Sequence, residues 1–263
     1  MSWGMNNRLS KIIQPSTGRT VMLAVDHGYF MGPTTGLEQL NRMIDPLLPH
    51  ADVLMVTRGG LRNYVPENVD VPIVLRVSGG TSILNKNLLH EGISVSMEEA
   101  IRMNVAGVAF SILVGAKFER DTILGFTQTI DEAERYGIPT LAVTAVGKDM
   151  VRDARYMALA SRMAAELGAR IVKTYYVDDF EKVVDSCPVP IVIAGGKKIP
   201  EKDALVMAYN AIQAGASGVD MGRNIFQSED PVAMIQAVKS VVHEDFTPDE
   251  AFQKFTTLKN KKE

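Results

Sequence analysis

The sequence contains a single cysteine, Cys187, so no disulfide bond can form within the chain. This excludes a disulfide-dense secreted scaffold and suits a reducing compartment. We expect Cys187 to be a small buried residue leading into a strand, not a nucleophile. No signal-peptide core is present, and no apolar run reaches the roughly 18 residues of a membrane span. The sequence therefore predicts a cytoplasmic protein with no membrane partner.

An excess of one charge is also missing. The 28 Lys and Arg residues are outnumbered slightly by 31 Asp and Glu residues, which gives a net charge of -3. This balance provides no basic surface for nucleic acid. The sequence has no zinc motif, and His50, His90 and His243 have no partner at metal-ligand spacing. We therefore expect surface or structural roles for these histidines, and no metal at the functional site.

The 263 residues suit one large barrel, or two small domains as a weaker alternative. Short apolar runs alternate with polar or glycine-containing segments and helical stretches, which is typical of βα units around a parallel sheet. The predicted strands are Thr20–Val25, Asp52–Val56, Val71–Leu75, Gly107–Leu113, Pro139–Thr144, Arg170–Thr174, Val189–Ala194 and Gly218–Met221. Eight such runs predict a closed (β/α)8 TIM barrel, with residues 1–263 as a single domain.

Helices are clearest in the second half. The periodicity predicts them over Asp121–Tyr136, Arg155–Leu167 and Pro200–Ala214, and the second has Leu159, Met163 and Leu167 on one apolar face. Residues 28–38 and 79–96 are glycine-rich or polar insertions after strands, and we expect them on the catalytic face. An open doubly wound sheet is the competing fold, but the first strand lacks the G-x-G-x-x-G loop that would normally follow it.

Lys173 lies near the end of the sixth predicted strand. Polar residues are unusual in parallel strands that are covered by helices, so this lysine needs a reason. At the C-terminal end of a barrel strand it would point into the mouth, where partial desolvation favours the free amine. A free amine can attack a carbonyl and form an iminium, which serves as an electron sink for carbon–carbon cleavage. The alternative is a snorkelling or ion-paired lysine.

Asp26 and His27 end the first predicted strand. A carboxylate beside the barrel mouth can move protons or hold the lysine ammonium before reaction. It can also cap a loop, because Asp readily accepts hydrogen bonds from nearby backbone N–H groups. We keep His27 as a second catalytic candidate.

A phosphate site is predicted after the last two strands. Gly195 and Gly196 follow the seventh strand and precede a helix, while Gly222 and Arg223 follow the eighth. Glycines let backbone N–H groups approach an oxyanion, and Arg223 adds a fixed positive charge. The alternative is two tight turns. Three further basic residues could bind a second anionic group or satisfy a buried carboxylate, namely Arg58, Arg76 and Lys148. Lys197 and Lys198, which follow the glycine pair, could simply be solvated.

Four segments together resemble one known family. They are LAVDHG at 23–28, VKTYY at 172–176, AGGKK at 194–198 and GRNIFQ at 222–227. This set is similar to the class I, Schiff-base aldolase family that includes the archaeal-type fructose-bisphosphate aldolases, and the likeness runs over nearly the whole chain. The segments HGYFMGPTTGL at 27–37, VGKDMVRD at 146–153 and GVDMGRNIFQ at 218–227 resemble a thiolase branch of it.

The resemblance implies that Lys173 forms the Schiff base, with Asp26 as its acid–base neighbour and Gly195, Gly196, Gly222 and Arg223 around the phosphate. It also implies a phosphorylated keto substrate, no bound cofactor and a homo-oligomer, commonly a decamer. In the thiolase branch coenzyme A is the acceptor of an acetyl group, and dihydroxyacetone phosphate is released.

One departure bears on the branch. The fructose-bisphosphate branch resembles Tyr-Pro-Arg-Gly after the fifth strand, with the tyrosine transferring a proton. This chain has Thr144-Ala145-Val146-Gly147 there, and Ala145 cannot move a proton. The sequence therefore favours the thiolase branch, with a fructose-bisphosphate or related Schiff-base aldolase as the alternative. A non-catalytic sugar-phosphate sensor is a third possibility, but it would not need Lys173.

Overall fold

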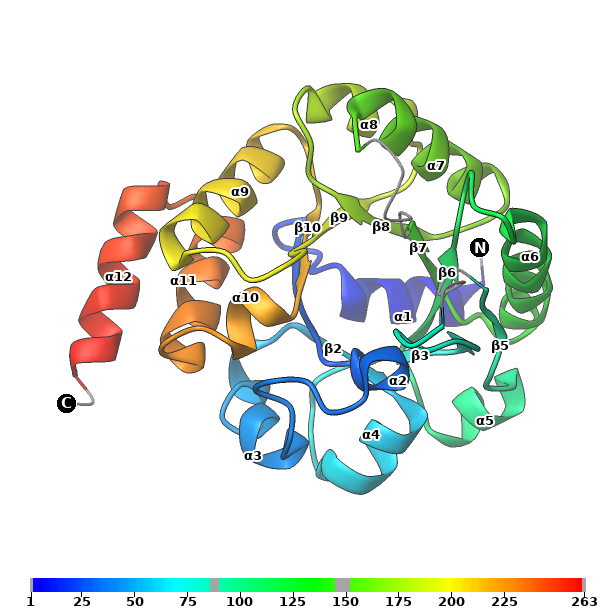
Figure 1. The fold of residues 1–263 in the computed structure, drawn as a ribbon, viewed down its shortest axis with the longest axis horizontal. Helices are drawn as coiled ribbons and strands as arrows, with labels where there is room; N and C mark the ends of the chain where they lie inside the picture. The colour runs from blue at the N-terminus through cyan, green and yellow to red at the C-terminus, as the bar shows by residue number, and fades with distance from the viewer. Residues whose placement is uncertain (1, 86–89, 145–151, 262–263) are drawn as a thin grey trace.

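The computed structural model describes residues 2–85, 90–144 and 152–261. Within them, eight strands close into a parallel barrel in the order β1-β10-β9-β8-β7-β6-β3-β2 (Figure 1). The first and last strands of the barrel pair in register, with Leu23 beside Met221. The predicted (β/α)8 fold is confirmed, and the open doubly wound sheet was the wrong alternative.

The barrel strands lie within two residues of their predicted bounds. They are β1 (Thr20–Ala24), β2 (Val53–Thr57), β3 (Ile73–Arg76), β6 (Gly107–Ile112), β7 (Thr140–Thr144), β8 (Ile171–Tyr175), β9 (Ile191–Ala194) and β10 (Gly218–Met221). Two short strands that the sequence did not predict, β4 (Ser78–Gly79) and β5 (Gly92–Ile93), form an antiparallel pair. The first begins one residue before the 79–96 insertion and the second lies within it.

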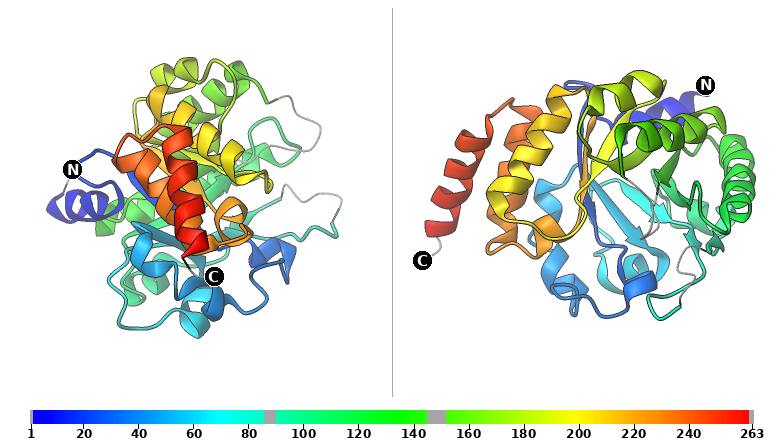
Figure 2. Two further views of the ribbon diagram at one scale, coloured as in Figure 1. Left: turned by 90° about the vertical axis from the view of Figure 1, so that its left-hand side faces the viewer. Right: turned by 45° about the horizontal axis from the view of Figure 1, so that its top comes forward.

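Helices surround the barrel (Figure 1). They are α1 (Trp3–Ile12), α2 (Gly28–Met31), α3 (Leu40–Ile44), the 3-10 helix η1 (Leu48–His50), α4 (Arg58–Tyr64), α5 (Met97–Arg102), α6 (Glu119–Tyr136), α7 (Ala154–Glu166), α8 (Phe180–Ser186), α9 (Glu201–Gln213), α10 (Arg223–Phe226), α11 (Pro231–His243) and α12 (Pro248–Asn260). The last helix, α12, packs outside α9 and α11 (Figure 2). No helix among the described residues is long and apolar enough to cross a membrane.

Side chains alternate between the two faces of each strand, and this alternation builds two cores. The outer core lies between the strands and the helices and includes the buried rings of Phe110, Phe126 and Phe180. The inner core fills the lower barrel with apolar side chains such as Met22 and Met55. Ile12, at the end of α1, joins this inner cluster, so α1 closes the barrel opposite to α2 (Figure 2).

One predicted helix face is wrong. Leu159 was expected to face the core through α7, yet its side chain is 52% exposed. The buried positions of α7 are instead Met157, Ala160, Ser161 and Ala164. Ala160, Ser161 and Ala164 let this helix pack closely on the barrel, and the face that they share with Met157 leaves Leu159 on the solvent side.

Candidate active site

A cavity of about 210 Å³ opens at the C-terminal ends of the barrel strands. The inward positions on these strands become polar just above the inner core. On β8, for example, Ile171 belongs to the inner core, whereas Lys173 and Tyr175 line the cavity. The same change occurs on β3, where Val74 lies in the inner core and Arg76 lines the cavity. This is the end of the fold at which barrel enzymes carry their catalytic groups.

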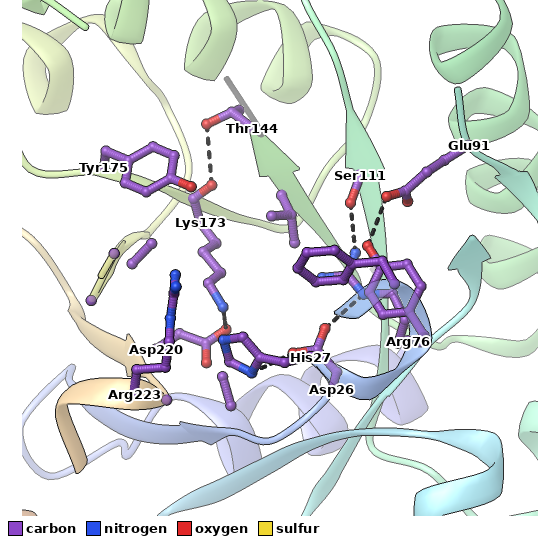
Figure 3. A pocket seen from close by; sticks show the side chains of 18 of the residues that line it. Asp26, His27, Arg76, Glu91, Ser111, Thr144, Lys173, Tyr175, Asp220 and Arg223 are labelled. Carbon is purple, nitrogen blue, oxygen red and sulfur yellow. Dashed lines mark hydrogen bonds and ion pairs between the residues drawn. The ribbon is translucent and has the colours of Figure 1, made fainter. Parts of the chain in front are cut away.

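Lys173 is buried and pairs with a carboxylate from a different strand. Its Nζ lies 2.9 Å from Oδ2 of Asp220 on β10 (Figure 3). The same nitrogen lies 3.8 Å from the sulfur of Met55. Asp220 is 0% exposed. Burial raises the pKa of Asp220, although the positive charge of Lys173 acts in the opposite direction. Lys173 therefore faces, inside the cavity, a carboxyl group for which burial favours the neutral form.

Asp26 has a different partner. Its Oδ2 accepts a hydrogen bond of 2.8 Å from Nε of Arg76, and both residues are buried. Arg76 also donates from Nη1 to the hydroxyl of Ser111 at 2.8 Å. Burial opposes ionisation of Asp26, but the charges of Arg76 and Lys173 outweigh it and lower its pKa. Asp26 is therefore an ionised carboxylate at neutral pH, and Arg76 satisfies it.

A second carboxylate continues this network towards the mouth. Glu91 accepts hydrogen bonds from the hydroxyl of Tyr29 at 2.7 Å and from that of Ser78 at 2.6 Å. The ring of Tyr29 lies 5.3 Å from the guanidinium carbon of Arg76. These contacts join the loop after β1 to the β4–β5 insertion and keep the wall of the cavity polar.

His27 lines the cavity as a neutral imidazole. Burial is the main cause that lowers its pKa to about 4, and the opposing effect of Asp26 is smaller. Nδ1 lies 4.0 Å from the nearer oxygen of Asp26, too far for a hydrogen bond. Within the described part of the chain, this nitrogen is buried without a hydrogen-bond partner. The ring also stands edge-on to Phe226, with centroids 5.6 Å apart.

The predicted phosphate residues converge on the same cavity. Gly195, Gly196, Gly222 and Arg223 all line it. A Cβ on Gly222 would lie only 2.5 Å from the carbonyl oxygen of Ala24 and from the His27 ring, so glycine is required there. Nε of Arg223 is buried and has no hydrogen-bond partner among the described residues. A guanidinium with a free Nε, in a cavity that both glycine loops line, is suited to binding an oxyanion.

Asn224 fixes the two loops to each other. Its amide nitrogen donates to the carbonyl of Gly195 at 2.6 Å, and its oxygen accepts from the backbone N–H of Ile199 at 2.9 Å. The side chain is completely buried. The glycine loop after β9 is therefore held at both ends by one residue of the loop after β10.

Some sequence candidates lie elsewhere. Arg58 is exposed at the start of α4 and does not line the cavity. Lys197 is exposed, as expected for a solvated lysine, whereas Lys198 pairs with Glu201 at 2.7 Å. Lys148 and Ala145 fall outside the described residues.

The structure also shows where the single cysteine and two of the other histidines lie. Cys187 is buried, as predicted. His243 is structural, because its Nε2 lies 2.6 Å from Oδ2 of Asp52 at the far end of the barrel. His90 is half exposed and stacks on Phe118.

Sequence reasoning missed several residues of the site. Asp220, Ser111 and Tyr175 line the cavity, as does Glu91. A signal for the first was present, because Asp220 is a lone carboxylate inside an apolar strand and therefore needs a buried partner. Tyr175 follows Lys173 by two positions and hence shares its face of the strand. Glu91 lies in the irregular insertion, where no periodicity marks it.

Together these groups can bind a phosphorylated carbonyl compound and attack it. The glycine loops and Arg223 have the chemistry of an anion site, Lys173 carries an amine, and Asp220 and Asp26 are two carboxyl groups with pKa values moved in opposite directions. Two carboxyl groups separated in this way are suited to different roles in proton transfer.

Comparison with known proteins agrees with this chemistry. The family model of the DeoC/LacD family aldolases matches residues 20–228. The chain is 57% identical over 260 residues to the 3-hydroxy-5-phosphonooxypentane-2,4-dione thiolase of Photorhabdus laumondii, covering 98% of this chain and 89% of that protein. It is 59% identical over 254 residues to the protein of the same name from Enterobacter sp. (strain 638), covering 96% and 86%.

Solved structures of similar fold include Schiff-base aldolases. An archaeal fructose 1,6-bisphosphate aldolase aligns with a TM-score of 0.81 at 26% identity, over 91% of this chain and 99% of the other. The same values describe an archaeal fructose-1,6-bisphosphate aldolase whose catalytic lysine is covalently bound to the carbinolamine intermediate of its substrate. A fructose-bisphosphate aldolase from Slackia heliotrinireducens has a TM-score of 0.85 at 20% identity and supports the fold alone.

Proposed function

The chain belongs to the DeoC/LacD aldolase family. From its identity of 57% and 59% to two relatives of that name, we propose that it is a 3-hydroxy-5-phosphonooxypentane-2,4-dione thiolase. In this reaction an acetyl group passes from the phosphorylated dione to coenzyme A, and dihydroxyacetone phosphate remains. The observation that carries the proposal is the position of Lys173, which lies buried at the barrel mouth in a cavity that Arg223 and both glycine loops also line.

The phosphate selects which carbonyl meets the lysine. In the dione, a single methylene separates the phosphate ester from the C4 ketone. Phosphate bound by Gly195, Gly222 and Arg223 brings this ketone to the amine of Lys173, in the cavity that all four residues share. Attack by the amine, followed by loss of water, gives an iminium at C4.

The iminium then allows the carbon–carbon bond to break. The sulfur of coenzyme A attacks the C2 carbonyl and forms the new C–S bond. The electron pair of the C2–C3 bond moves to C3 and onwards to the iminium nitrogen, which becomes a neutral enamine. Protonation of C3 and hydrolysis release dihydroxyacetone phosphate and restore the lysine. Asp26 and the neutral His27 are the groups that we assign to the proton steps at C3 and its hydroxyl, because both line the cavity that also holds Lys173.

A fructose-bisphosphate aldolase is the alternative, favoured by the fold neighbours with a TM-score of 0.81. Cleavage of fructose bisphosphate passes through the same dihydroxyacetone phosphate enamine, so Lys173 and the phosphate site suit both reactions. The difference lies at the hydroxyl that must lose a proton as the bond breaks. General acid–base help there typically contributes 10²–10⁴-fold, and Ala145 in the sequence provides none.

Steady-state assays of the purified protein on both substrates separate the two reactions. We expect kcat/KM for acetyl-coenzyme A formation from the dione to exceed that for fructose bisphosphate cleavage by at least roughly 10²-fold, the lower limit of the missing acid–base contribution. Comparable or reversed values would assign the protein to the aldolase alternative.

A Lys173→Ala variant tests the Schiff base and the sensor alternative together. Borohydride reduction with dihydroxyacetone phosphate should add one covalent adduct at Lys173 in the wild type and none in the variant. The fold should survive, because a side chain at the cavity wall provides little core packing; circular dichroism checks this. An adduct on another lysine in the variant would overturn the assignment. Phosphate binding by the wild type without any adduct or turnover would favour a sensor.

The remaining parts of the proposal concern partners. Coenzyme A is the acceptor substrate and no cofactor is bound between turnovers. The enzyme acts in the cytoplasm as a homo-oligomer, and the family resemblance implies a decamer. Light scattering on the purified protein tests the subunit number.

A further inference from the structure

Asp220 touches the reacting nitrogen but has no role in the reaction as described so far. It is 0% exposed and lies on β10, with Lys173 on β8 as its close charged contact at 2.9 Å (Figure 3). The contact with Lys173 is made by Oδ2, whereas Oδ1 has no hydrogen-bond partner within the described residues. A buried carboxyl group with one oxygen unsatisfied is costly as a structural element, because burial of an unpaired polar atom is unfavourable.

The other carboxylate of the cavity cannot replace it easily. Asp26 is engaged by Arg76 through a charge-assisted hydrogen bond of 2.8 Å, and that contact favours its ionised form. A proton placed on Asp26 would have to disrupt this pair. Asp220 has no such competitor, since Arg76 and Asp26 affect it only through their more distant charges.

We propose that Asp220 is the proton carrier for Lys173: it accepts the proton that frees the amine and returns it to the hydroxyl group that leaves as the Schiff base forms. The inference rests on the proposed function, because it requires that Lys173 attacks a ketone. It makes Asp220 a catalytic residue and restricts Asp26 to the later steps at the substrate carbon.

The protons and charges of this step balance. Lys173 begins as an ammonium with three protons beside the Asp220 carboxylate. One proton passes to Asp220, the free amine attacks the ketone, and a second proton moves from nitrogen to the former carbonyl oxygen, giving a neutral carbinolamine. Asp220 then protonates that hydroxyl, the C–O bond breaks, and water leaves. The iminium keeps the third proton, and Asp220 is again a carboxylate beside a positive nitrogen.

The position of Asp220 suits both halves of this step. Its contact of 2.9 Å is short enough for direct transfer from nitrogen. Burial favours the neutral acid, so the protonated form is a reachable intermediate. The carboxylate also faces a cation before and after the reaction, which means that the site returns to its starting charge without exchange of ions with solvent.

An Asp220→Asn variant tests the proposal, with Asp245→Asn as the matched control. The control makes the same change at a residue whose side chain is 69% exposed and pairs with Arg19. Each protein is mixed with dihydroxyacetone phosphate and borohydride, and intact-mass spectrometry follows the adduct over time. We expect the initial trapping rate of Asp220→Asn to fall at least roughly 10²-fold, as for loss of a general acid–base, while the control matches the wild type.

A counter-ion without a proton-transfer role predicts a different result. Removing only its negative charge would favour the free amine, so trapping would keep its rate and its pH profile would move to lower pH. That outcome would overturn the proposal while leaving the Schiff base intact. Absence of an adduct in the wild type would instead overturn the proposed function, and the inference with it.

An Asp220→Ala variant provides a second test that does not rely on the shape of asparagine. Formate fits the space of the missing carboxyl group and can carry a proton, whereas formamide has the same size but cannot accept one at neutral pH. We expect formate, and not formamide, to raise the trapping rate in a concentration-dependent manner. Equal rescue by both compounds, or by neither in a folded variant, would contradict proton transfer by Asp220.

Discussion

Replacing Arg76 by methionine should destabilise the protein through Asp26. Methionine fills much of the same space, but the buried carboxylate loses its hydrogen bond of 2.8 Å. Breaking a buried ion pair by removing one partner typically costs about 3–5 kcal/mol. The nearby charge of Lys173 also favours ionised Asp26, so we expect a loss near the lower limit, about 3 kcal/mol at pH 7.

The pH dependence of this loss identifies its cause. In the wild type the pKa of Asp26 is lowered, so the pair stabilises the folded state above the ordinary pKa of 3.8 and this contribution disappears as the pH falls through the folded value. In the Arg76→Met variant burial without the guanidinium raises that pKa, and protonation relieves the penalty. The difference in unfolding free energy between the two proteins should therefore shrink towards acidic pH.

Urea unfolding followed by far-UV circular dichroism measures these free energies. Tryptophan fluorescence is a poor probe, because the single tryptophan, Trp3, is 80% exposed. An Asp26→Asn/Arg76→Met double variant should recover a large part of the loss, since it removes the uncompensated charge. A single variant as stable as the wild type, or a loss that is constant from neutral to acidic pH, would refute this account of Asp26.

Two further predictions concern the phosphate site and the far end of the barrel. Arg223→Ala should weaken binding of dihydroxyacetone phosphate by about 1.5–3 kcal/mol, the range for a charge-assisted hydrogen bond, and should barely affect binding of dihydroxyacetone. Calorimetry measures both affinities, and an equal loss of binding free energy for the two compounds would mean that Arg223 is structural. Burial opposes ionisation of Asp52, but hydrogen bonds from His243 and Lys239 outweigh it and lower the pKa of this carboxyl group. The contribution of Asp52 to the free energy of unfolding should therefore be lost as the pH falls below 3.8. Asp52→Asn should cost roughly 1.5–3 kcal/mol at pH 7, and less under acid in urea unfolding; a loss independent of pH would contradict this.

Local patterns in the sequence were sufficient to predict the barrel fold and the cavity residues that lie at the ends of its strands. Lys173 could be identified because a lysine at the end of a buried strand is unusual, and Gly195, Gly222 and Arg223 because two glycine loops follow consecutive strands. These signals involve neighbours along the chain. Each of these residues lines the cavity, although their roles there stay predictions.

The partners of these residues could not be predicted in the same way. Lys173 on β8 meets Asp220 on β10, and Arg76 at the end of β3 meets Asp26 after β1. In each case one strand lies between the two. Inward side chains in a closed barrel form layers that alternate strands provide, so such contacts depend on closure and not on pairing between adjacent strands. Which face of α7 is buried depends likewise on how closely the helix packs on the barrel, and the spacing of Leu159, Met163 and Leu167 does not show this distance.

Closure of the barrel also constrains the order in which the chain can fold. Thr20–Leu23 of β1 pairs with Gly218–Met221 of β10, so the last joint of the barrel connects segments separated by most of the sequence. Contacts of such long separation form late, because the entropy of a large loop must be overcome first. During synthesis, β1 has only β2 as a neighbour until β10 leaves the ribosome. Since Asp220 and the loop after β10 arrive with that final strand, a nascent chain cannot bind the phosphate or hold Lys173 in its ion pair before the barrel closes.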